Sequence, residues 1–228
     1  AGGEGAPLVP AFHKWVLSGD VPRGILNIGG ISNLTVLPER GSDDEVLGFD
    51  CGPGNVLMDA WIEKVNHVRY DQDAVWARSG KVIPQLLEIL KQEKFFSQVP
   101  PKSTGRELFN LPWLEVRLNG EKPEDVQRTL VSFTAETVTD AIRNFAPHIK
   151  ELRVCGGGAK NPLMISELAL LNPDLLVTTT ADLGVDPQDV EGLAFAWLAY
   201  RFDRRETGNL PSATGASGSR ILGCLYPA

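Results

Sequence analysis

Cysteine and long apolar runs are both scarce in this sequence. The cysteines, Cys51, Cys155 and Cys224, are three in number and far apart, so they form neither a disulfide framework nor the paired spacing of a metal site. Such usage is typical of a reducing compartment, and we expect a cytoplasmic protein. No apolar run approaches the roughly 18 residues that a membrane-spanning helix needs. We therefore expect no membrane partner.

Positive charge is also in short supply. Lys and Arg number 22 against 29 Asp and Glu, which gives a net charge of −7. A non-specific nucleic-acid binder needs a basic face that displaces counterions from phosphates, so we expect no nucleic-acid partner. With 43% hydrophobic and 22% charged residues, the 228-residue chain has ample material for one large core or two small ones. It begins at Ala1 without a start methionine, so we expect a piece of a longer protein or a processed one.

Strand patterns dominate the first part of the chain. Two apolar runs around a Gly-Gly pair within residues 24–37 predict a β-hairpin. A short strand at 46–49 then leads into a glycine-rich turn at 50–55. Apolar residues spaced by four predict that a helix follows at once, with Asp59 and Glu63 pointing away from the core.

Helices and strands alternate in the rest of the chain. Apolar spacing predicts one long helix over 123–145. A strand at 152–155, a glycine loop, a helix capped by Asn161 and a strand at 175–179 together predict a parallel β-α-β crossover. We expect Asp186-Pro187 to open the last clear helix, and its inward residues are Val190, Leu193, Ala194 and Trp197. The alternation predicts an α/β fold.

Three glycine-rich turns are the main candidates for chemistry: Gly29-Gly30, Gly52-Pro53-Gly54-Asn55 and Gly156-Gly157-Gly158. The first is a hairpin turn, and the other two follow a strand and precede a helix, where free backbone N–H groups attract phosphate. One such turn is weak evidence for a nucleotide site, because most glycine-rich turns only allow the backbone to turn tightly. Three in one acidic chain, without a Walker or G-x-G-x-x-G pattern, indicate a nucleotide held by backbone loops.

Short polar side chains lie at or beside these turns, namely Asn27, Asn33, Asp50, Asn55 and Asn161. Turn and cap chemistry can explain them, and for Asn161 it is the favoured explanation. For Asp50, which we expect at the end of a strand, a role beside phosphate or Mg²⁺-bound water is supported as well as turn chemistry is.

Other polar residues have plainer explanations. The loop 102–107 combines two cations with two hydroxyls and could contact phosphate, but its spacing favours a surface turn. His13, His67 and His148 have no neighbour at metal-ligand spacing, so we expect them on the surface or in packing. Glu191, near the start of a helix, is in a position that is usually solvated, although the small residues beside it indicate that another element packs close.

Taken together, these motifs resemble the anhydro-N-acetylmuramic acid kinases. The resemblance runs in order through residues 2–13, 27–35, 49–55, 100–107, 155–164, 191–199 and 208–216, and so covers essentially the whole chain. It implies the ribonuclease H-like, actin-like ATPase fold of sugar kinases and Hsp70 chaperones, mainly its second, nucleotide-binding lobe. Residues 1–20 would then connect the lobes, and residues 21–228 would form the second lobe.

The resemblance also implies an activity. Members of this family open the ring of 1,6-anhydro-N-acetylmuramic acid with water and phosphorylate O6 from Mg-ATP, which recycles cell-wall sugar as N-acetylmuramate 6-phosphate. The implied cofactors are ATP and Mg²⁺, with Asp50 at the metal and Gly2, Gly3 and Glu191 at the sugar. We also expect a homodimer. The implied nucleotide-binding residues are Asn27, Gly29, Gly30, Asn33, Asp50, Gly52, Gly54, Asn55, Gly156, Gly157, Gly158 and Asn161.

The sequence departs from the family pattern in several ways. The first lobe is absent, and the general-base aspartate is expected just upstream of Ala1, so we expect no catalytic residue in this chain and no kinase activity from it alone. Glu4 stands where glutamine is usual, and Cys51 where threonine is usual. Two alternatives stay open. One is a non-catalytic actin-like module, and the other is a different sugar or acetate kinase, against which segments 100–107 and 208–216 argue.

Overall fold

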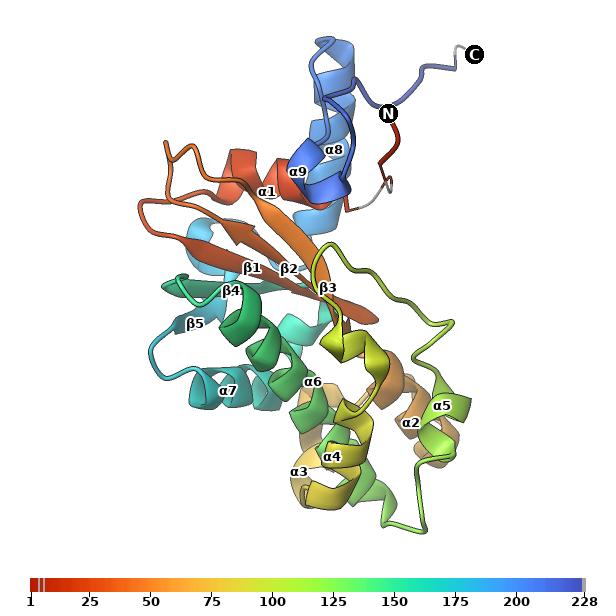
Figure 1. Cartoon of the computed structure of the whole chain (residues 1–228). Coiled ribbons are helices and arrows are strands. Elements are labelled where there is room, and N and C mark those ends of the chain that lie inside the picture. The colour runs from red at the N-terminus through yellow and green to blue at the C-terminus, as the bar shows by residue number, and fades with distance from the viewer. Residues whose placement is uncertain (4, 6, 227–228) are drawn as a thin grey trace.

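A five-stranded mixed sheet lies at the centre of the molecule (Figure 1). The computed structural model describes residues 1–3, 5 and 7–226. The strand order is β3-β2-β1-β4-β5, with β1 antiparallel to β2 and parallel to β4. The strands are β1 (Arg23–Ile28), β2 (Ile31–Leu37), β3 (Leu47–Pro53), β4 (Glu151–Cys155) and β5 (Leu176–Thr179).

Helices cover both faces of this sheet (Figure 1). On the lower face in that view are α2 (Val56–Asn66), α3 (Val75–Ser79), α4 (Pro84–Lys91), α5 (Leu111–Glu115), α6 (Pro123–Phe145) and α7 (Pro162–Leu171). On the upper face are α1 (Val9–Leu17), α8 (Val190–Asp203) and α9 (Pro211–Thr214). Short 3-10 helices are η1 (Gln72–Ala74), η2 (Lys94–Ser97), η3 (Gly157–Lys160) and η4 (Thr180–Leu183). No helix in the described part of the chain has the length and hydrophobicity needed to cross a membrane.

Each face of the sheet has its own hydrophobic core. Leu26 and Ile28 of β1 belong to the lower core, which includes Phe133 of α6. Ile25 of the same strand belongs to the upper core with Phe12 of α1 and residues of α8. Successive strand residues point to opposite faces, so β1 contributes alternately to both cores. The sheet is therefore held from both sides.

Several sequence predictions are confirmed. The hairpin forms as β1 and β2, the long helix runs from Pro123 to Phe145, and β4, α7 and β5 make the parallel crossover. The Asn161 side chain caps α7 by accepting hydrogen bonds from the N–H groups of Leu163 and Met164, at 3.1 and 3.0 Å. Local patterns therefore sufficed where strand, cap and helix follow one another directly.

The expected turn at 50–55 is wrong in its first half. Strand β3 continues through Asp50 to Pro53, so Asp50 lies within a strand and not at its end. The β2–β3 register shifts between Ser32 and Asn33, and Gly52 has a φ of 138°, so a bulge carries the strand past the glycine. Pro53 is tolerated because β3 is at the edge of the sheet.

The predicted start of the last helix is also wrong. Helix α8 begins at Val190, because Asp186 closes a turn in which its Oδ1 accepts the N–H of Gln188 at 2.8 Å. Within α8, Val190, Ala194 and Trp197 are buried as expected, whereas Leu193 is 44% exposed.

Candidate functional site

The first two glycine turns are joined by backbone hydrogen bonds. The carbonyl of Gly30 accepts the N–H groups of Gly54 and Val56 at 2.8 and 3.1 Å, and that of Gly29 accepts the N–H of Asn55 at 2.7 Å. A side chain on Gly54 would collide with the Gly29 carbonyl, so only glycine permits this approach. The hairpin turn and the start of α2 thus form one rigid unit.

The third glycine turn packs against the same unit. Because β4 is parallel to β1, Cys155 lies beside Asn27, and Gly156 follows at the end of the strand. A Cβ atom on Gly156 would collide with Oδ1 of Asn27, and one on Gly157 would lie 3.5 Å from Nδ2 of Asn55. Gly156 also has a φ of 79°, which side-chain-bearing residues rarely adopt. The three turns predicted separately from the sequence therefore meet.

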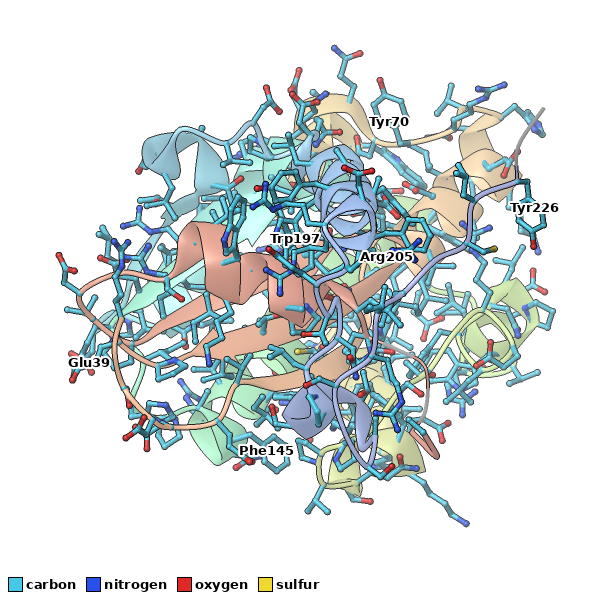
Figure 2. The ribbon with its side chains drawn as sticks, turned by 90° about the horizontal axis from the view of Figure 1, so that it is seen from above. Glu39, Tyr70, Phe145, Trp197, Arg205 and Tyr226 are labelled. Carbon is cyan, nitrogen blue, oxygen red and sulfur yellow. The ribbon has the colours of Figure 1, made fainter. Side chains whose placement is uncertain are left out.

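A cavity of about 450 Å³ opens beside these turns. Of the predicted nucleotide residues, Asn55, Gly157 and Asn161 line it. The remaining lining residues are Met58, Asp59, Tyr70, Asp71, Gln72, Asp73, Gln127, Lys160 and Gln188. Helices α2 and α7 both begin at this cavity, and the positive ends of their dipoles favour an anion. Figure 2 shows Tyr70 at the edge of the molecule, on the segment that follows α2.

Three predicted polar residues form a row across the sheet. Asn27 is directly opposite Asn33, and Asn33 is directly opposite Asp50. Cross-strand neighbours have Cβ atoms about 4.5–5.5 Å apart, so the row is continuous. All three side chains are half-buried. They lie on the face covered by α1, where Thr35, two residues beyond Asn33, bonds to Nδ1 of His13 at 2.9 Å.

Asp50 is the carboxylate of this row. Its Oδ2 accepts the N–H of Thr104 at 2.9 Å. Burial raises the pKa of Asp50 and nearby Glu107 adds to the rise, while the Thr104 hydrogen bond and Lys102 act in the opposite direction. Within the described residues, no group of three His, Cys, Asp or Glu side chains could hold a metal. Mg²⁺ is commonly held by one or two carboxylates, phosphates and water, so Asp50 fits as a single carboxylate ligand or water-mediated contact.

The prediction of a surface turn at 102–107 is only partly confirmed, because Ser103, Arg106 and Glu107 are exposed but the rest of the loop packs inward. Lys102 is 9% exposed, with its Nζ 4.7 Å from the centre of the Phe95 ring. Thr104 bonds to Asp50, and Nη2 of Arg106 lies 3.7 Å from where a Cβ on Gly30 would be. The loop therefore places a guanidinium beside the hairpin turn. Its two cations and two hydroxyls were the only indication in the sequence.

Two of the residues that line the cavity were not predicted from the sequence. Asp59 was expected to point away from the core, but it is half-buried, and burial raises its pKa to about 6 despite the opposing charge of Arg106. Its position one turn beyond Asn55 on the same helix could have indicated this. Gln127 is buried in the second turn of α6, and no local pattern distinguishes it.

The residues expected at the sugar lie apart from this cavity. A Cβ on Gly3 would lie 2.6 Å from the carbonyl oxygen of Thr214, so the start of the chain packs against the end of α9. Gly2 has a φ of 72°, and Glu191 is exposed on α8. Glu4 lies outside the described residues. None of Gly2, Gly3 and Glu191 is among the residues that line the cavity beside the glycine turns.

The remaining candidates behave as packing or surface groups. Cys51 and Cys155 are buried, and burial raises the pKa of each thiol to about 12. His13 is fully buried, whereas His67 and His148 are exposed. These observations confirm that the two cysteines act as small buried groups and that His13 serves in packing.

Comparison with solved structures supports the fold. The activator of the 2-hydroxyisocaproyl-CoA dehydratase from Clostridium difficile, solved with bound ADPNP, superposes with a TM-score of 0.52 at 15% identity. The match covers 89% of this chain and 69% of that one. At this identity the likeness concerns the fold alone, which is α/β with a mixed sheet and of the actin-like ATPase type.

Comparison by sequence identifies the family. The chain is 52% identical over 235 residues to the anhydro-N-acetylmuramic acid kinase of Ralstonia nicotianae, and 52% identical over 237 residues to that of Photobacterium profundum. Each match takes in 100% of this chain and 62% of the relative, so the chain spans less than two thirds of their length. The model of the anhydro-N-acetylmuramic acid kinase family matches residues 1–228. The chain therefore belongs to the anhydro-N-acetylmuramic acid kinase family.

Proposed function

We propose that this protein is an ATP-dependent kinase that opens 1,6-anhydro-N-acetylmuramic acid with water and phosphorylates O6, giving N-acetylmuramate 6-phosphate for cell-wall recycling. The observation that carries the proposal is the junction of the three glycine turns, in a chain that matches this family from end to end. The relatives carry the name of this activity. A fold alone would not support a substrate, because the same scaffold serves many functions.

In this proposal the glycine turns hold the phosphates of ATP. The N–H groups of Gly54 and Asn55 already bond to the hairpin carbonyls, so this turn contributes close approach rather than donors. Donors would come from the first turn of α2 beyond Val56, because the N–H groups of Leu163 and Met164 at the start of α7 already bond to the Asn161 side chain. Lys160, which lines the cavity, and Arg106, which lies beside Gly30, supply positive charge. Phosphoryl transfer depends mainly on such positioning and electrostatics.

Asp50 has two possible tasks in this scheme. It would hold Mg²⁺ beside the phosphates, directly or through water, and the ion would neutralise charge on the transferred group. A half-buried carboxylate with a raised pKa is also suited to accept a proton from water. The described residues thus include a candidate for the base that the sequence resemblance places upstream of Ala1.

The remaining assignments are part of the same proposal. Residues 1–20 would link two lobes, and Gly2, Gly3 and Glu191 would contact the sugar in the closed enzyme. Closure would exclude bulk water and limit wasteful ATP hydrolysis. A homodimer and a cytoplasmic location stay predictions, which gel filtration with light scattering and cell fractionation would test.

The test of this function is a product assay. The protein, made with any flanking sequence that its gene encodes, is incubated with ATP, Mg²⁺ and 1,6-anhydro-N-acetylmuramic acid, and products are identified by mass spectrometry. We expect equal amounts of ADP and N-acetylmuramate 6-phosphate, and no phosphorylation of glucose or acetate. Residues 1–228 alone should bind ATP without forming product. Bound nucleotide without sugar-dependent ADP release in the gene-encoded protein would instead favour a non-catalytic module.

A further inference from the structure

Gln127 is an unusual side chain in the wall of the nucleotide cavity. It lines the cavity beside the glycine turns and is 1% exposed. Its Oε1 atom is buried, and no hydrogen-bond partner exists for it within residues 1–3, 5 and 7–226. Buried amide oxygens are nearly always paired, because an unpaired one loses its interaction with water without a replacement. An unpaired amide at a cavity wall therefore calls for a partner from outside the chain.

The other buried polar residues of α6 make the contrast clear. Thr129 donates to the Asp125 carbonyl at 2.7 Å, and Thr134 donates to the Pro53 carbonyl at 3.0 Å. Ser132, Thr137 and Thr139 also have partners. The buried hydroxyls of α6 thus have hydrogen-bond partners within the protein. Among the buried polar side chains of α6 in the described residues, Gln127 alone has an unpaired atom, and it also lines the cavity.

The chemistry of a glutamine amide indicates what the partner is. The amide presents one acceptor and two donors in a plane, which matches the amino group and adjacent ring nitrogen of adenine in a two-bond contact. Guanine and hypoxanthine carry an oxygen where adenine has the amino group, so in the orientation that pairs with adenine Oε1 would face a second acceptor. Buried Met58 lines the same cavity and offers an apolar surface to a flat ring. Tyr70, 62% exposed, offers an aromatic one.

We propose that Gln127 reads the purine base through its side-chain amide and makes this cavity selective for adenine nucleotides over 6-oxopurine nucleotides. The proposal rests on the proposed function, because it takes the cavity to be the nucleotide site. It goes further by assigning base selectivity to one residue outside the glycine turns. The phosphate contacts would then supply affinity common to all nucleotides, and Gln127 would distinguish between bases.

The experiment compares ATP with inosine triphosphate, whose base has an oxygen in place of the 6-amino group and a hydrogen on N1. Calorimetric titration of the protein should show ATP binding about tenfold more tightly, as a two-bond amide–base contact allows. Gln127→Leu should weaken ATP to the level of inosine triphosphate and leave the latter unchanged. Gln85→Leu, on the exposed side of α4, is the matched control and should keep the wild-type ratio.

The outcomes separate this inference from the proposed function. If the wild-type protein binds neither nucleotide, the proposed function itself fails. If it binds ATP but Gln127→Leu keeps the wild-type ratio, Gln127 is only a buried amide and this inference alone is overturned. If the variant fails to fold, the same inference is tested on the wild-type protein with purine riboside triphosphate, a nucleotide whose base lacks the amino group. Binding as tight as that of ATP would overturn the inference, and binding about tenfold weaker would support it.

Discussion

The side-chain amide of Asn55 donates a hydrogen bond to the carbonyl oxygen of Ile28, 3.2 Å away. Ile28 is the last residue of β1, and Asn55 immediately precedes α2, so this contact ties the end of a central strand to the start of a helix. The backbone N–H of Asn55 binds the next carbonyl, that of Gly29, at 2.7 Å. One residue therefore fixes two glycine turns relative to each other, and a change there should affect both.

Gly54→Ala tests the close approach of these turns. The new Cβ would collide with the Gly29 carbonyl, which is backbone and cannot move away freely. We expect a loss of about 1–3 kcal/mol in the free energy of unfolding, the usual cost of overpacking, and weaker ATP binding. Urea unfolding measures the first effect. Gly192→Ala, on helix α8, is the control, because its Cβ would meet nothing within 4 Å. This substitution should raise the free energy of unfolding by up to about 1 kcal/mol.

Arg106→Ala tests whether loop 102–107 contacts phosphate. Its guanidinium lies beside Gly30, where the proposed phosphates would be. Loss of a charge-assisted hydrogen bond should weaken ATP binding about tenfold or more while leaving adenosine binding unchanged. Arg78→Ala, on the exposed side of α3, should change neither. Equal weakening of ATP and adenosine would mean that Arg106 acts only on the shape of the site.

The pH dependence of stability tests the burial of Asp59. Its pKa is raised from 3.8 to about 6 in the folded protein, so the folded state holds the proton more tightly than the unfolded chain between these values. The free energy of unfolding should therefore fall, relative to Asp59→Asn, as pH rises from about 4 to about 6. Urea titrations across this range measure the difference. The same comparison with Asp43→Asn, on an exposed loop, is the control.

His13 should have the opposite effect in acid. Burial lowers its pKa from 6.5 to about 3, so the unfolded chain takes up a proton that the folded protein excludes. Wild-type stability should fall, relative to His13→Gln, as pH drops from 6.5 toward 3, and the difference should be constant above that range. His148→Gln, on the surface, serves as the control. A constant difference throughout would show that His13 is not held neutral.

The sequence predicted those parts of the site that depend on neighbours along the chain. The hairpin around Gly29, the cap at Asn161 and the parallel crossover all follow from adjacent turn and helix signals. Asp59 and the inward contacts of loop 102–107 were missed because the residues that surround them come from distant parts of the chain. Thr104 meets Asp50 across 54 positions, and no local spacing records that contact. Gln127 was missed for the same reason, since α6 looks regular in sequence and only packing sets this residue at the cavity.

The most direct test of the account is a crystal structure of the protein with Mg²⁺ and a non-hydrolysable ATP analogue. We predict phosphate density against the turns at Gly29, Gly54 and Gly157, with the base inside the cavity that Gln127 lines. Density for the analogue at another surface, or none at a saturating concentration, would contradict it.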